Sequence, residues 1–114
     1  QNIRPAGAAQ QEREINPFRM KSTRIFDDHI LGETPIVLAD ATRKVINITL
    51  PPAAAQASRI YIVKRLDDVQ NSSVRLKTSG NDKIDAQTLI SVPERGGIVF
   101  FSSGLGWHII ANYS

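Results

Sequence analysis

Two segments of this 114-residue chain carry consecutive apolar side chains where a surface strand would alternate apolar and polar ones. They are "IYIV" at residues 60–63 and "IVFF" at residues 98–101. Successive side chains of a strand point to opposite faces of its sheet, so both faces of these strands are apolar. The sequence offers no amphipathic helix to cover the second face. We therefore expect a second sheet to cover one face and another copy of the chain to cover the other.

Turn residues divide the sequence after residue 22 into short segments rich in β-branched and aromatic residues. A strand every 8–12 residues or so is typical of a sandwich or barrel. The sequence thus predicts an all-β fold, a single compact antiparallel β-sandwich or barrel of jelly-roll type, with one helical turn at residues 51–58. About eight short strands are expected, at residues 23–31, 35–39, 44–50, 59–66, 73–77, 88–92, 97–102 and 107–111.

The first 22 residues differ from the rest, because they are polar, contain prolines and glycine, and have too few apolar residues for a core. We predict an extended N-terminal arm over residues 1–22, either anchoring or flexible, and a β domain over residues 23–114. The apolar residues of the arm are its candidate anchors: Ile3, Ile15, Phe18 and Met20. The sequence lacks the apolar stretch of a secretory signal and any membrane span of roughly 20 apolar residues.

Composition argues against several classes of function. The chain has no cysteine, which excludes disulfides, thiol catalysis and cysteine-ligated zinc. Its net charge of +3 comes from 14 basic and 11 acidic residues that are scattered, whereas a nucleic-acid site would cluster its basic residues. The glycine-rich "SSGLG" at residues 102–106 does not lead into a helix, so it is a hairpin turn and no phosphate loop. We expect no catalytic residues, no cofactor, no nucleic-acid partner and no membrane partner.

Three acidic clusters were weighed as metal sites. The sequence "DDH" at residues 27–29 lacks a second pair of ligands and is interpreted as solvated residues at a strand edge. Asp67 and Asp68 are interpreted as a hairpin turn. The oxygen donors of residues 79–85 lack the spacing of an EF-hand, and Asx-turn chemistry explains them without calcium. The sequence therefore predicts no metal site.

Aromatic and apolar strand residues supply the candidate interaction sites. Trp107 with Tyr61 or Tyr113 would form a platform for stacking sugars, whereas a single tryptophan after a tight turn usually fills a core. His108 is expected to be packed or to lie between subunits. The candidates for the trimer interface or the core are Tyr61, Val63, Val99, Phe101 and Trp107.

Four sequence pieces occur in a recognisable order. They are "TLP" at residues 49–51, "RIYIVK" at 59–64, "GNDKID" at 80–85 and "GLGWHII" at 104–110. This ordered set, over residues 23–111, resembles a β module of bacteriophage and other viral fibre, tail-spike and capsid-decorating proteins.

The resemblance implies a compact, non-enzymatic β domain that assembles as a homotrimer about a fibre axis. It implies a place in the virion, on the capsid surface or in a short head or tail fibre. The arm would then attach the domain to the major capsid protein or to another virion protein. The alternative function is a carbohydrate-binding module of a tail fibre that recognises a host-surface glycan.

Overall fold

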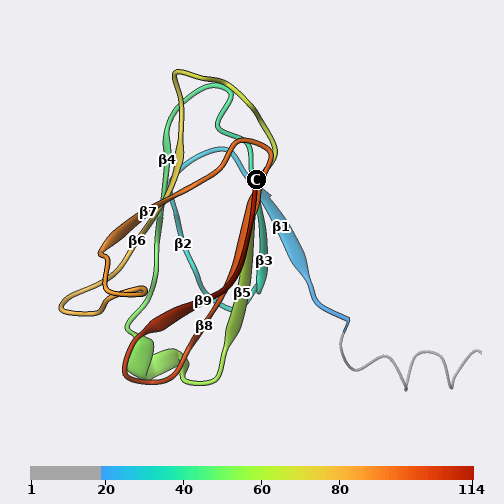
Figure 1. Ribbon diagram of the computed structural model, residues 1–114. Coiled ribbons are helices and arrows are strands. Elements are labelled where there is room, and N and C mark those ends of the chain that lie inside the picture. The colour runs from blue at the N-terminus through green and yellow to red at the C-terminus, as the bar shows by residue number, and fades with distance from the viewer. Residues whose placement is uncertain (1–18) are drawn as a thin grey trace, which may run out of the picture.

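The computed structural model describes residues 19–114, which are nearly all β-structure (Figure 1). Its elements are β1 (Ser22–Ile25), β2 (His29–Ile30), β3 (Ile36–Ala39), β4 (Ile46–Thr49), the 3-10 helix η1 (Ala53–Gln56), β5 (Ile60–Arg65), β6 (Val74–Lys77), β7 (Leu89–Val92), β8 (Gly97–Ser102) and β9 (Trp107–Tyr113). Each predicted strand overlaps an observed one, and η1 lies in the predicted helical turn. The first predicted strand, 23–31, is divided into β1 and β2.

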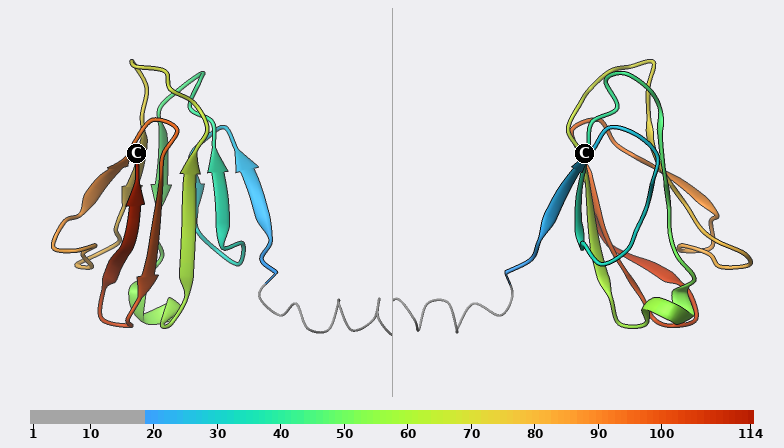
Figure 2. Two further views of the ribbon diagram at one scale, coloured as in Figure 1. Left: turned by 45° about the vertical axis from the view of Figure 1, so that its right-hand side comes forward. Right: turned by 180° about the vertical axis from the view of Figure 1, so that it is seen from behind.

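The strands form two sheets of mixed pairing that face one another (Figure 2). Sheet A has the order β1-β3-β5-β8-β9, and sheet B has the order β2-β4-β6-β7. Strands β1 to β6 alternate between the two sheets. Each of the strands β3 to β6 pairs in parallel with the strand two positions before it in the chain. The chain from β1 to β6 therefore winds as a coil whose turns are β1–β2, β3–β4 and β5–β6.

Antiparallel strands close one end of this coil. Strand β7 pairs with β6, β8 pairs with β5, and β9 pairs with β8. At the other end, β1 and β2 are the edge strands of their sheets. The predicted antiparallel pairing is thus correct for β7 to β9 and wrong for β1 to β6, and a jelly roll does not have this parallel connectivity. Alternation cannot distinguish the two pairings, because side chains have period two in both.

The core fills the space between the sheets with the inward-facing residues of both. An aromatic cluster lies in the core near the β8–β9 hairpin: the Trp107 ring lies 5.6 Å from that of Phe100 and 5.8 Å from that of Tyr61, measured between centroids. All three side chains are buried. Fully burying a large apolar side chain contributes roughly 1.5–3 kcal/mol, so this cluster is a main source of stability.

The described part of the chain begins just before β1. Of the predicted anchors, Ile3, Ile15 and Phe18 lie outside the described residues, and Met20 is exposed. Residues 19–21 continue from the start of β1 away from the two sheets (Figure 2). In residues 19–114 no helix is long and apolar enough to cross a bilayer.

Candidate self-association surface

The face of sheet A that points away from the core is mainly apolar over four neighbouring strands, and it also carries Lys64 on β5 and His108 on β9. We call this surface the outer face of sheet A, and its main apolar residues are Ile36, Leu38, Ile60, Ile62, Val99, Phe101 and Ile110. They alternate with buried residues such as Val37, Tyr61 and Phe100, which identifies the two sides of each strand. The side chains are half-buried or exposed, although an apolar surface in water is costly.

Strand register places these side chains next to one another. Ile62 pairs with Ile36 on one side and with Val99 on the other. In the next row, Ile60 pairs with Phe101. A register shift between Val99 and Phe100 adds one residue to β9, and the additional residue, Ile110, is 55% exposed. The apolar side chains therefore form one continuous surface that spans β3, β5, β8 and β9.

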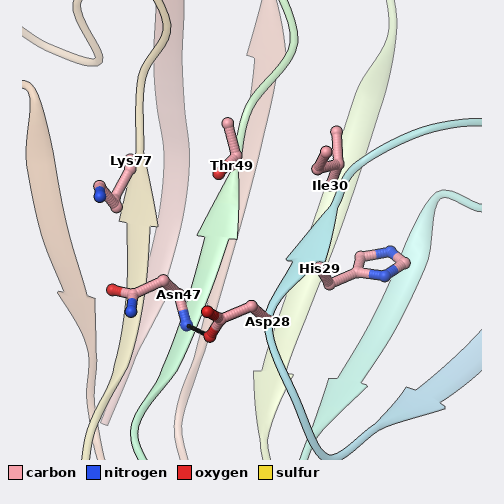
Figure 3. Close-up of a pocket in the computed structure, with 6 residues that line it drawn as sticks. All are labelled: Asp28, His29, Ile30, Asn47, Thr49 and Lys77. Atoms are coloured by element: carbon pink, nitrogen blue, oxygen red, sulfur yellow. Dashed lines mark hydrogen bonds between the residues drawn. The ribbon is translucent and has the colours of Figure 1, made fainter.

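Sheet B is mostly polar on its outer face, where Ile30 and Leu89 are the exposed apolar side chains. A shallow hollow of about 550 Å³ lies there, lined by Asp28, His29, Ile30, Asn47, Thr49 and Lys77 (Figure 3). The Asp28 carboxylate accepts a hydrogen bond from the backbone N–H of Asn47 at 2.9 Å. Polar and charged groups of this kind are well solvated without a partner. The outer face of sheet A, and not this hollow, therefore requires cover.

A hairpin with internal hydrogen bonds borders the outer face of sheet A at the β8–β9 connection. Ser103 Oγ accepts a hydrogen bond from the Leu105 N–H at 3.3 Å and donates one to the Gly106 carbonyl at 3.4 Å. Gly104 has φ +92°, a backbone conformation that glycine adopts without strain. The Leu105 side chain at the tip is 95% exposed. The hairpin therefore adds one more apolar side chain beside the surface.

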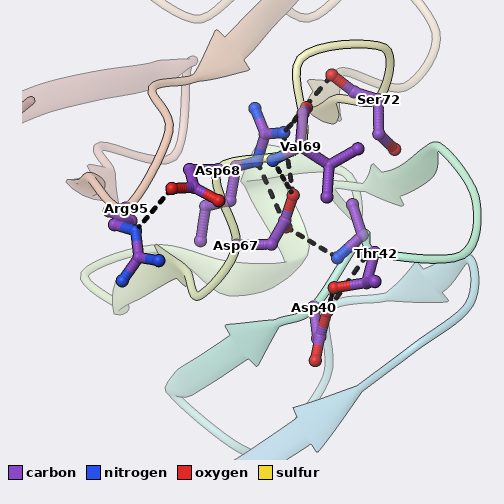
Figure 4. Close-up of polar contacts among 9 residues, drawn as sticks. Asp40, Thr42, Asp67, Asp68, Val69, Ser72 and Arg95 are labelled. Atoms are coloured by element: carbon purple, nitrogen blue, oxygen red, sulfur yellow. Dashed lines mark hydrogen bonds and ion pairs between the residues drawn. The ribbon is translucent and has the colours of Figure 1, made fainter.

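A buried ion pair fixes the end of the coil where the chain passes from β5 to β6. The Arg65 guanidinium donates from Nη2 to Asp67 Oδ2 at 3.0 Å, and the two side chains are only 4% and 5% exposed. The same nitrogen donates to the carbonyl of Val69 at 2.8 Å and to that of Ser72 at 3.3 Å. Figure 4 shows Asp67, Val69 and Ser72 of this cluster. The predicted hairpin turn at Asp67 and Asp68 is therefore wrong, since this segment crosses from sheet A to sheet B.

Asp67 also joins two turns of the coil. Its carboxylate accepts hydrogen bonds from the backbone N–H groups of Ala41, at 2.8 Å, and Val69, at 3.0 Å. Burial by itself would raise the pKa of Asp67, but the Arg65 guanidinium and the two amides outweigh it and lower the pKa to about 2. The group is thus held ionised as a structural anion.

The other acidic clusters are bound within the fold. Asp27 pairs with Lys44 at 2.6 Å, which lowers the pKa of this aspartate, chiefly through the hydrogen bond between them. The Asp82 carboxylate accepts a hydrogen bond from the backbone N–H of Ala53 at 2.8 Å, at the start of η1. Across residues 19–114, no three acidic, histidine or cysteine side chains come together as a metal site.

The structure separates the predicted interface-or-core residues into two groups. Tyr61, Val63 and Trp107 are buried in the core, whereas Val99 and Phe101 lie on the outer face of sheet A. The sugar-stacking platform of Trp107 and Tyr61 is therefore wrong, because both rings are inside the protein.

Sequence reasoning did not select the remaining residues of the outer face, namely Ile36, Leu38, Ile60, Ile62 and Ile110. The apolar run at residues 60–63 did indicate a strand with two apolar faces. Because the side chains on both faces of such a strand are apolar, the sequence does not show which face points to the core. The hydroxyl of Tyr61 donates to the Gly32 carbonyl at 2.7 Å, and this bond accompanies the inward position of the ring.

Neither the protein-family models nor the curated proteins with which the chain was compared give a match.

Proposed function

We propose that this chain is a non-enzymatic virion structural protein that assembles as a homotrimer through the outer face of sheet A. In this proposal the β domain decorates a phage capsid or forms a short head or tail fibre. Residues 1–22 attach it to the major capsid protein or to another virion protein. The finer description of the domain as a β-sandwich belongs to the same proposal, since the two sheets face one another around a shared core.

The observation that carries the proposal is the contrast between the two outer faces. The outer face of sheet A presents seven apolar side chains in adjacent rows, with Lys64 beside Leu38. The outer face of sheet B is mostly polar and has two exposed apolar side chains, Ile30 and Leu89. Copies of the chain are the natural cover, because an apolar surface of several hundred Å² is seldom left in water. A closed assembly such as a trimer removes this surface from solvent in every subunit.

The ordered sequence pieces that resemble viral fibre modules support the assignment to a virion. The course of the chain before β1 supports a separate attachment role for the arm. Residues 19–21 lead away from the sheets at the edge strand β1, so a partner can hold the arm without covering the outer face of sheet A (Figure 2).

Attachment is tested by deleting residues 1–18. We expect the shortened chain to fold and to keep the mass of the full-length assembly, because β1 and the outer face of sheet A remain. It should no longer co-sediment with particles purified from the phage that encodes the chain, whereas the full chain should. Equal particle occupancy of the two chains would refute attachment through the arm.

A further inference from the structure

His108 lies on the outer face of sheet A, which also carries the charged side chain of Lys64 beside Leu38. It follows the buried Trp107 on β9 and pairs with Phe101 across the ladder. Its ring centroid lies 5.3 Å from that of Phe101, at an angle of 34°. We infer that proton uptake by His108 weakens self-association through the outer face of sheet A. The inference rests on the proposed function, since it describes how that same interface is regulated.

One hydrogen bond holds the ring. His108 Nε2 lies 3.0 Å from Ser103 Oγ. The hydroxyl accepts when Nε2 carries a hydrogen and donates when it does not, so this contact suits either neutral tautomer. In the charged ring both nitrogens carry hydrogens, so Nε2 donates to Ser103 and Nδ1 requires a further acceptor.

The surroundings of His108 supply little compensation for a positive charge. Phe101 of β8 and Ser103 of the β8–β9 hairpin, both uncharged, lie next to the ring. On the other side of β9, the segment that pairs with Trp107 carries Lys83 and Asp85. Within residues 19–114 neither of these two side chains forms an ion pair with His108. The charged ring would therefore depend on water for its stability.

Assembly removes that water. A neutral imidazole loses hydration at moderate cost, whereas a charged group buried without a partner costs far more. In the separate protomer the exposed imidazolium keeps its water, whereas its contact with the Phe101 ring lies within one chain and is present in both states. Protonation therefore favours the separated copies. Histidine changes charge between about pH 5 and pH 8, so the effect falls in a physiological range.

The test compares the dissociation constant of the assembly at pH 7.5 and pH 5.5, measured by sedimentation over a dilution series. The chain has two histidines and no cysteine, so few other groups titrate between these pH values. We expect the dissociation constant of the wild-type assembly to be at least about tenfold larger at pH 5.5 than at pH 7.5. His29→Gln, in sheet B, is the matched control and should behave as the wild-type protein does.

Two variants remove the titrating group. His108→Gln keeps a polar side chain, and His108→Phe keeps a ring on Phe101; both should assemble equally at the two pH values. A wild-type protein that assembles equally at both pH values would overturn this inference and leave the proposed function standing. If both His108 variants kept the pH response of the wild-type protein, this inference would also be overturned and the proposed function would stand. Single protomers at both pH values would overturn the proposed function and this inference together.

Discussion

Replacing Ile62 by glutamate should separate the assembly into single protomers. Ile62 lies at the centre of the outer face of sheet A, between Ile36 and Val99. Its side chain points away from the core, so the protomer can fold with a carboxylate there. In the assembly that carboxylate would be buried against apolar side chains. We expect the dissociation constant to rise at least ~100-fold, about 2.8 kcal/mol.

A matched control is Thr49→Glu, which places the same side chain on a strand of sheet B beside Lys77. It should keep the wild-type mass in light scattering. Ile110→Glu tests the same surface at a residue on the edge strand β9 that is 55% exposed, where folding is not at risk. An assembly of unchanged mass in both Ile62→Glu and Ile110→Glu would show that this surface is not the interface.

Replacing Asp67 by alanine should destabilise the fold by roughly 3–5 kcal/mol, because it leaves the buried Arg65 charge without its anion. It also leaves the Ala41 and Val69 amides without their acceptor. Urea unfolding at pH 7 and a fixed protein concentration measures this loss. Asp68→Ala is the control, since its pair with Arg95 is exposed and should change stability by less than about 1 kcal/mol.

The same residue gives the stability of the fold a defined pH dependence. The pKa of Asp67 is about 2 in the folded protein, against an ordinary value of 3.8. Folding therefore gains stability from the ionised group above about pH 4, and loses it as the pH falls through 2. This contribution is about 2 kcal/mol. A gap between wild type and Asp67→Ala that stays constant from pH 5 to pH 2 would contradict this role.

Much of the fold follows from local patterns in the sequence. Alternation and turn residues located β3 to β9 to within a few residues, and the prolines before Ala53 located η1. The division of residues 23–31 into β1 and β2 was missed, because it depends on the contact of Asp28 with the distant Asn47. Parallel pairing was missed for a related reason: it is set by where the loops cross between sheets, and periodicity carries no information about that.

The sequence predicted that an apolar strand face lies outside the core, but it did not predict which residues form that face. The run at residues 98–101 correctly indicated a strand with two apolar faces, of which Phe100 turned out to face the core and Phe101 the outside. For residues 60–63 the sequence left open which alternation faces the core, and Tyr61 and Val63 are the inward-facing residues. The role of Asp67 was hidden for another reason, because its partner Ala41 is 26 residues away along the chain.

Light scattering on the wild-type chain at micromolar concentration and neutral pH tests most directly whether copies cover the outer face of sheet A. We expect a particle with three times the mass of one chain, independent of moderate dilution. A mass of one chain at every concentration would mean that Ile62, Val99 and Phe101 remain in water, which would contradict the proposed assembly.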